Sequence, residues 1–177
     1  MRASIGDGVR RGGLAAAVIG LCLCLLATAA HAQPERAGGR LDTAGLRAAL
    51  GALGYQPREV RNEAGVEYEI VLRLRTGAAV TTRVTLSRDG SLVWLVAWLK
   101  KVPPGRTVSG NAVLDMLVEN DAIGPTHFSY NERVRWFFLN SPVVNQDLTT
   151  ERLRGEIDHV AGIAARTEPL WDFERWR

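Results

Sequence analysis

The sequence predicts an α+β domain with an antiparallel sheet, and three observations carry this prediction. Alternating apolar and polar residues indicate strands, and apolar residues spaced by three and four indicate helices. Turn-forming residues such as Gly, Pro, Asn and Asp separate these segments. In chain order the expected elements are a helix, three strands, a helix, two strands and a helix (α-β-β-β-α-β-β-α).

The first 32 residues have the composition of a cleavable export signal. Arg2, Arg10 and Arg11 precede the apolar run 14–29, and Ala30-His31-Ala32 supplies the small residues that a signal peptidase requires. We expect cleavage after Ala32 and a periplasmic or secreted mature protein without membrane attachment. The alternative is an uncleaved anchor, because the run approaches the roughly 17–25 residues that span a bilayer.

Both cysteines, Cys22 and Cys24, lie inside the expected signal, so the mature chain would have none. This excludes a disulfide framework, a thiolate metal site and a cysteine nucleophile. Loss of the signal lowers the formal net charge from +3 to about +1. Only Lys100, Lys101 and Arg106 form a short basic cluster, which argues against nucleic acid as a partner.

The mature chain is expected to begin with a flexible linker, residues 33–40, followed by one domain, residues 41–177. Asp42, Ser109 and Thr149 are the expected N-caps of the three helices, because their side chains accept hydrogen bonds from free backbone N–H groups. The apolar stripes expected to be buried are Leu46, Leu50 and Leu53 in the first helix, Val113, Leu114, Leu117 and Val118 in the second, and Leu153, Ile157, Val160 and Ala164 in the third.

Five strands are expected, at residues 66–74, 80–86, 91–99, 126–130 and 133–139. Arg88-Asp89-Gly90 is a hairpin signal, because Gly accepts the positive φ of tight turns. Gly54 should end the first helix in the left-handed conformation, and Ser141-Pro142 should end the last strand.

The third expected strand is apolar on both faces, which is unusual for a sheet with helices on one side. Leu92, Trp94, Val96 and Trp98 alternate with Val93, Leu95, Ala97 and Leu99. Such a strand needs cover on both faces. Either other elements of this chain cover it, or a partner does.

Tryptophan anchors many protein interfaces because it buries a large area and keeps one polar group. The expected interaction surface combines the third strand with nearby aromatic residues: Val93, Leu95, Leu99, Trp94, Trp98, Trp136, Phe137 and Trp171. The alternative is that all the aromatic residues of this set belong to the core. An aromatic tail, Leu170 to Trp176, could cover the third strand within one chain or reach a second chain.

The mature sequence carries no catalytic motif. It has no nucleophile elbow, Walker loop, dinucleotide-binding glycine run or His-Glu-x-x-His helix. His127 lies near Asp121 and Glu132, but a metal site needs three or four convergent ligands. We therefore expect no catalytic residue, metal or cofactor, with a small periplasmic hydrolase or metal-binding enzyme using His127 as the alternative.

Five short segments combine apolar spacing with turn residues: Leu53-Gly54-Tyr55, Asp89-Gly90-Ser91-Leu92-Val93-Trp94, Val113-Leu114-Asp115-Met116-Leu117 with Asn120, Gly124-Pro125-Thr126-His127-Phe128-Ser129, and Asp147-Leu148-Thr149 with Leu153. In these segments the chain resembles the YbjN-like bacterial sensory-transduction regulators, which share the type III secretion chaperone-like fold.

The resemblance covers residues 41–171 and implies a non-enzymatic protein, often paired, that binds protein segments or acts as a regulatory adaptor. An export signal departs from what a cytoplasmic secretion chaperone would carry. The expected function is that of an exported, non-catalytic, chaperone-like or regulatory module that binds a protein or peptide. We also expect the chain to pair with itself as a homodimer.

Overall fold

A computed structural model describes residues 39–63 and 65–175 of the chain. The expected signal, residues 1–32, and most of the expected linker lie outside the described residues. Within the described range, no helix is both long enough and apolar enough to cross a membrane. The elements are, in chain order, α1 (Thr43–Ala52), β1 (Arg58–Asn62), β2 (Gly65–Arg73), β3 (Ala79–Leu86), β4 (Leu92–Lys101), α2 (Gly110–Ala122), β5 (His127–Asn131), β6 (Trp136–Val144), α3 (Thr150–Arg166), α4 (Glu168–Trp171) and the 3-10 helix η1 (Phe173–Arg175).

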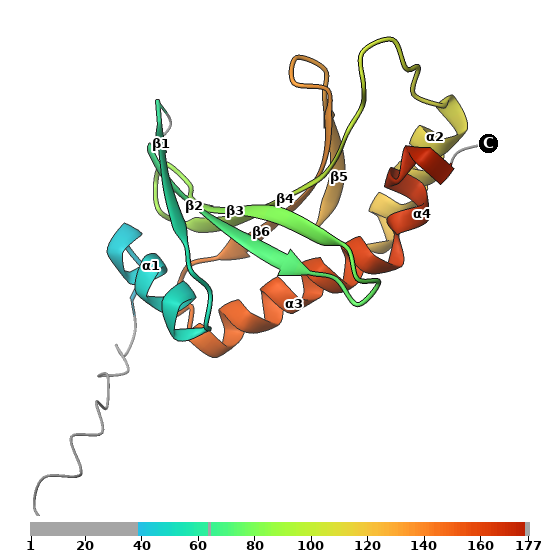
Figure 1. Cartoon of the computed structure of the whole chain (residues 1–177). Coiled ribbons are helices and arrows are strands. Elements are labelled where there is room, and N and C mark those ends of the chain that lie inside the picture. The colour runs from blue at the N-terminus through green and yellow to red at the C-terminus, as the bar shows by residue number, and fades with distance from the viewer. Residues whose placement is uncertain (1–38, 64, 176–177) are drawn as a thin grey trace, which may run out of the picture. The chain divides into compact units, whose positions relative to one another are not determined.

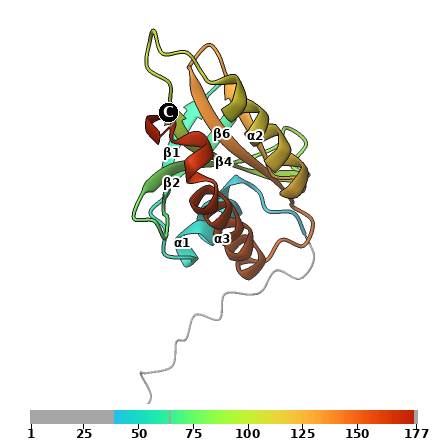
Figure 2. The same cartoon turned by 90° about the vertical axis from the view of Figure 1, so that its right-hand side faces the viewer.

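The six strands form one sheet in the order β1-β2-β3-β4-β6-β5, and every neighbouring pair is antiparallel. The predicted α+β class with an antiparallel sheet is therefore confirmed. Figure 1 shows α3 running along one side of the sheet, with α1 near one end and α2 and α4 near the other. Figure 2 looks onto the end that carries α2.

The predicted helix caps lie at the expected positions. The Asp42 carboxylate accepts a hydrogen bond from the Gly45 N–H at 2.7 Å, and the Thr149 hydroxyl accepts one from the Arg152 N–H at 3.1 Å. Ser109 is the residue before α2, although its side chain caps no N–H group there. Two caps thus fix the starts of α1 and α3, where the chain enters the helices that cover the core.

Three features of the strands differ from the prediction. β1 was missed because its sequence, Arg-Glu-Val-Arg-Asn, has no alternating apolar pattern, and as an edge strand it buries little. The break expected at Ser141-Pro142 does not occur, because β6 continues to Val144. β5 pairs with β6 only as far as Asn140, so Pro142 removes no hydrogen bond to β5. β6 also begins at Trp136, after a turn in which Arg135 has φ +57°.

β4 carries the core on one face. Val93, Leu95 and Leu99 are at most 6% exposed and pack in the main hydrophobic cluster with residues of α1, α3 and the neighbouring strands. The opposite face, with Trp94 and Trp98, is only half-buried. The elements of this chain therefore cover one side of β4 fully and the other side in part.

The prediction for the second helix was wrong. α2 buries Ala112 and Met116, and the four residues of its expected core stripe point outward. The described part of the aromatic tail, which excludes Trp176, folds onto its own chain. Trp171 is 4% exposed and its Nε1 donates to the Ala164 carbonyl at 3.0 Å, while Phe173 is 3% exposed.

Candidate docking surface

The largest set of exposed apolar side chains in the described domain lies on α2. We define the α2 surface as four residues of α2 and one residue of β5. They are Val113 (37% exposed), Leu114 (61%), Leu117 (58%), Val118 (73%) and, on β5, Tyr130 (38%). Single exposed apolar residues are common in folded proteins, but a contiguous group often marks an interaction site. This group occupies two successive turns of one helix and an adjacent strand.

The composition of α2 explains why it faces outward. Residues 112 and 116 lie one turn apart, so their small and flexible side chains form the contact with the core. The four exposed apolar residues lie on the neighbouring arc of the helix, where the described chain offers no layer to cover them. α2 therefore buries its narrower apolar face.

A groove of about 210 Å³ lies beside this helix, between α2 and the β5–β6 hairpin. Its wall on the helix side includes Val113, Met116 and Leu117, and its wall on the sheet side includes Phe128 and Tyr130. The exposed residues of α2 and the groove form one continuous apolar region, because Val113 and Leu117 belong to both.

Asn120 joins α2 to the outer edge of β5. Its Oδ1 accepts a hydrogen bond from the Phe128 N–H at 2.6 Å, and its Nδ2 donates to the Phe128 carbonyl at 3.3 Å. A second polar link connects α2 to α3, where the Arg166 guanidinium lies 2.6 Å from the Glu119 carboxylate. These two links hold a helix that has few buried side chains.

The eight residues predicted as an interaction surface fall into two groups. Five lie in the core or under the helices: Val93, Leu95, Leu99, Phe137 and Trp171. These five are at most 6% exposed, so their burial argues against that part of the predicted surface; of the five, Phe137 also lines the groove beside α2. Trp94, Trp98 and Trp136 lie on the other side of the sheet and are half-buried.

Two of these tryptophans, Trp98 and Trp136, form an aromatic strip with Phe138 across β4 and β6, and Trp94 lies on the same face of β4. The Trp98 ring meets Trp136 and Phe138 edge to face, with centroids 5.3 and 5.0 Å apart. The Arg83 guanidinium lies 4.4 Å from the Trp98 ring centre, in the range of a cation–π contact. Side chains of this chain therefore cover part of the strip.

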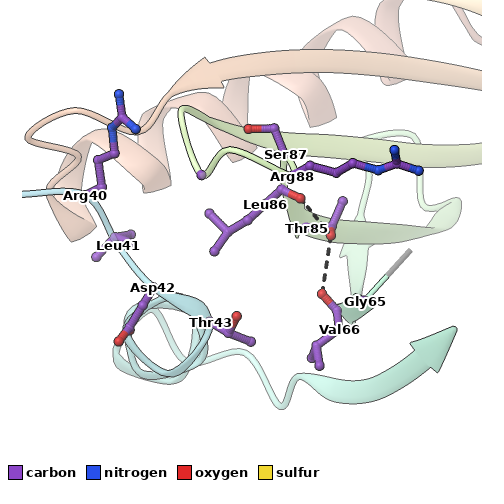
Figure 3. A pocket seen from close by; sticks show the side chains of 11 residues that line it. Arg40, Leu41, Asp42, Thr43, Gly65, Val66, Thr85, Leu86, Ser87 and Arg88 are labelled. Atoms are coloured by element: carbon purple, nitrogen blue, oxygen red, sulfur yellow. Dashed lines mark hydrogen bonds between the residues drawn. The ribbon is translucent and has the colours of Figure 1, made fainter. Parts of the chain in front are cut away.

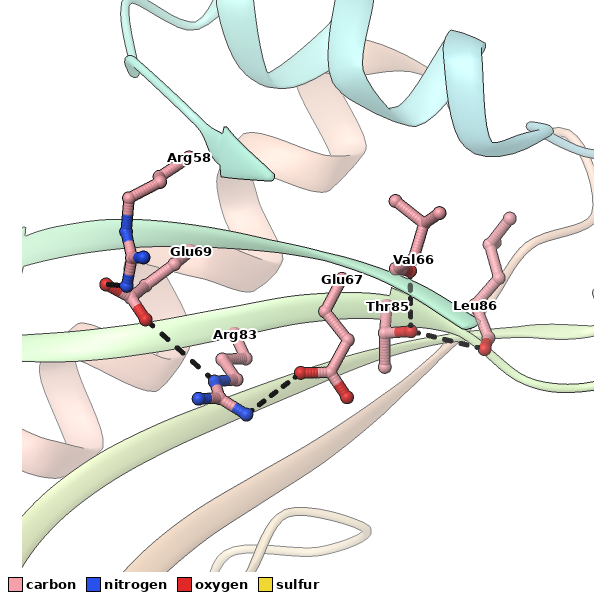
Figure 4. Close-up of polar contacts among 7 residues, drawn as sticks. All are labelled: Arg58, Val66, Glu67, Glu69, Arg83, Thr85 and Leu86. Atoms are coloured by element: carbon pink, nitrogen blue, oxygen red, sulfur yellow. Dashed lines mark hydrogen bonds and ion pairs between the residues drawn. The ribbon is translucent and has the colours of Figure 1, made fainter. Parts of the chain in front are cut away.

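Figure 4 shows the ion pairs that surround Arg83 on the same side of the sheet. Arg83 lies 3.1 Å from Glu67 and 3.9 Å from Glu69, and Arg58 lies 2.7 Å from Glu69. The two arginines and two glutamates balance in charge. They extend from β1 to β3 and connect through Arg83 to the aromatic strip.

Figure 3 shows a second hollow, of about 430 Å³, between the start of α1 and the ends of β2 and β3. Arg40 and Arg88 line it, and the Asp42 carboxylate in its wall is already used as the α1 cap. At the adjoining turn, hydrogen bonds from the Ser87 hydroxyl and from Ser91 hold the pKa of Asp89 at about 2. The acidic groups here stabilise the helix start and the turn.

At the opposite end, a basic group holds the C-terminal segment. Lys100 Nζ lies 3.1 Å from the Asp172 carboxylate and 3.5 Å from that of Glu174. Partial burial acts to lower the pKa of Lys100, but the hydrogen bonds and charges of these two carboxylates outweigh it and raise that pKa. Arg106 donates to the Phe173 carbonyl at 2.6 Å, so the loop before α2 is tied to the same segment.

The ring of His127 contacts the backbone. Its Nδ1 lies 3.1 Å from the Pro125 carbonyl, and its side chain is half-buried on β5. Among the residues that the structure describes, no group of three His, Cys, Asp or Glu side chains is placed to hold a metal ion. The alternative of an enzyme that uses His127 with Asp121 and Glu132 gains no supporting geometry.

The α2 surface was not predicted from the sequence, although the distribution of charged residues around α2 is unusual. Residues 107–132 contain four acidic side chains and no Lys or Arg, which sets this segment apart from the rest of the chain. Periodicity alone could not tell which apolar arc of the helix faces inward, because α2 carries apolar residues on both arcs.

No protein-family model and no curated protein matches this chain. Among solved structures, it is similar to a chain of the HopA1–SchA chaperone–effector complex, with 11% identity and a TM-score of 0.45 over 65% of this chain and 83% of that chain. It is also similar to a chain of the heterodimeric ExoU–SpcU complex from the type III secretion system of Pseudomonas aeruginosa, with 17% identity and a TM-score of 0.47 over 72% of this chain and 98% of that chain. These sequence identities and TM-scores are too low to assign a function to this chain.

Proposed function

We propose that this protein is an exported, non-catalytic module that binds other proteins through the α2 surface. The observation that carries the proposal is the exposure of four large apolar side chains on one helix, beside an apolar groove. Leaving this area in water is unfavourable by about 25 cal/mol per Å² of apolar surface. A partner that covers it gains this free energy on binding.

Export is the second part of the proposal, and the N-terminal sequence supports it. A basic segment, an apolar run and a small-residue cleavage site are the three parts of a secretory signal. Absence of cysteine after residue 32 suits a domain that folds outside the cytoplasm without disulfides. Sequencing the N-terminus of the protein recovered from the cell envelope would test the expected start at Gln33.

Self-pairing is a second candidate, and the aromatic strip favours it. Trp94, Trp98 and Trp136 are half-buried on the side of the sheet that the described helices leave open in Figures 1 and 2. The molar mass of the protein in solution tests this candidate. A dimer that becomes a monomer on Trp136→Ser supports it, and a monomer at every concentration contradicts it.

The main proposal is tested by matched surface variants. In Leu114→Asn/Val118→Asn two exposed residues of α2 become polar, and in Val71→Asn/Val144→Asn two similarly exposed valines of the sheet do. Partners captured from the envelope are identified and purified, and their affinity for each variant is measured. We expect the α2 variant to lose binding and the sheet variant to keep it.

Equal binding by both variants would contradict the role of the α2 surface. Unfolding curves of the two variants serve as the control for folding, because both pairs of residues are exposed and should cost little stability. His127→Ala tests the enzyme alternative, which requires a change in a measured activity or in metal content.

A further inference from the structure

We propose that the α2 surface binds an amphipathic helix of a partner protein whose apolar residues are flanked by Lys or Arg. This inference rests on the proposed function, because it names the kind of segment that the same surface takes. It follows from three features of the surface: the blocked edge of β5, the arrangement of apolar residues on α2, and the charge of the segment around them.

An extended segment cannot pair with β5 at Phe128, where the strand borders α2. A partner strand binds an exposed sheet edge through the N–H and C=O groups that point outward. At Phe128 both of these groups are already bonded to the Asn120 side chain. The other edge strand, β1, exposes the charged side chains of Arg58 and Arg61, a common way to discourage strand addition.

The apolar residues of α2 are arranged as a helix-packing surface. Val113 and Leu117 form one row of residues four apart, and Leu114 and Val118 form the next. Rows of this spacing form the ridges that pack into the grooves of a second helix. The groove between α2 and the β5–β6 hairpin can accept a side chain of that second helix, with Phe128 and Phe137 in its lining.

The charge of the surrounding segment selects the partner. Glu119 of α2 is paired with Arg166 at 2.6 Å, whereas Asp115 and Asp121 are exposed and have no ion-pair partner among the described residues. No Lys or Arg occurs from residue 107 to residue 132 to balance them. Complementary charge steers association and selects among partners, so basic flanks fit this surface.

The same charge disfavours a second copy of this chain as the occupant. In a two-fold interface the same patch meets itself. Two α2 surfaces would bring Asp115 and Asp121 of both copies into one interface, where like charges repel. A basic helix of another protein has no such cost.

Three synthetic peptides of about 20 residues test the inference, a length chosen because shorter helices are marginal in water. The first has Leu at spacings of three and four with Lys on its flanks, and the second has Glu in place of Lys. The third has the composition of the first but places Leu at every second position, which forms an apolar face only in a strand. Binding to the purified protein is measured by fluorescence anisotropy.

We expect the Lys helix to bind most tightly. Leu114→Asn/Val118→Asn should weaken its binding by about tenfold or more, and Val71→Asn/Val144→Asn should not change it. Asp115→Lys/Asp121→Lys should weaken the Lys helix and strengthen the Glu helix. This exchange of preference separates recognition at α2 from non-specific electrostatic attraction of the peptides to other parts of the protein.

Tighter binding of the strand-forming peptide, or an unchanged preference after charge reversal, would overturn the inference. A dimer that dissociates in the α2 variant would also overturn it, because a second copy would then occupy the surface. If natural partners depend on the α2 surface but bind it with a non-helical or acidic segment, the proposed function stands and this inference fails. If no partner or peptide depends on that surface, both fail.

Discussion

The helices α2 and α3 both contribute side chains to the core, but only α3 has its apolar residues covered. α3 buries six residues, from Leu153 to Ala165, in the core under the sheet. α2 buries two, Ala112 and Met116, and its other four large apolar side chains are exposed. The two helices therefore differ in how far the described chain covers them: α3 is packed on the sheet, and α2 leaves apolar surface in contact with solvent.

The location of each helix explains the difference. α3 runs along the sheet, so a wide apolar stripe meets strands on one side. α2 lies at the end of the sheet, where it meets the edge strand β5 and the short helix α4. An element at an edge has fewer neighbours, and part of its apolar surface stays uncovered unless another molecule supplies the cover.

The sharpest test of this comparison is a matched pair of leucine substitutions. Leu153→Ala in α3 should cost about 2–5 kcal/mol of unfolding free energy, because it empties a site that is 0% exposed. Leu117→Ala in α2, at a residue 58% exposed, should change stability by no more than about 0.5 kcal/mol. Urea denaturation of both variants measures the two values, and similar losses would mean that α2 is covered in solution.

The sequence allowed the class, three helices and five strands to be predicted, because local patterns determine these features. Alternation of apolar and polar residues revealed β2 and β3, and the caps Asp42 and Thr149 located the starts of α1 and α3. β1 was not predicted, because an exposed edge strand needs no apolar face. β6 extended further than predicted because Pro142 lies where β5 has already ended.

The candidate site was harder to predict than the fold, because exposure depends on tertiary neighbours. The apolar character of β4 was read correctly, but the face with Val93 and Leu95 turned out to be the core of this chain. In α2 two apolar arcs competed for the core, and the arc that carries Ala112 and Met116 occupies it. Only the contacts made by neighbouring elements decide between such arcs.

A second prediction concerns the attachment of α2 to the sheet. Asn120→Ala should cost about 1–3 kcal/mol, because it leaves the Phe128 N–H and carbonyl without their side-chain partner. Asn111→Ala, at an exposed asparagine of the same helix, is the control and should have little effect. Hydrogen exchange at the Phe128 amide should accelerate in the first variant only. Unchanged exchange there would mean that packing of Ala112 and Met116 holds α2 without the amide.

The smallest expected effect belongs to the ion pair between α2 and α3. The Glu119 side chain is 19% exposed and that of Arg166 is 51% exposed, so solvent screens their attraction. A double-mutant cycle with Glu119→Ala and Arg166→Ala should give a coupling free energy of about 0–1 kcal/mol at low salt. The coupling should decline as salt is added, because mobile ions screen the exposed guanidinium. A larger coupling that persists in high salt would show that the pair is shielded from water, and α2 would then be anchored more like α3 than its few buried residues indicate.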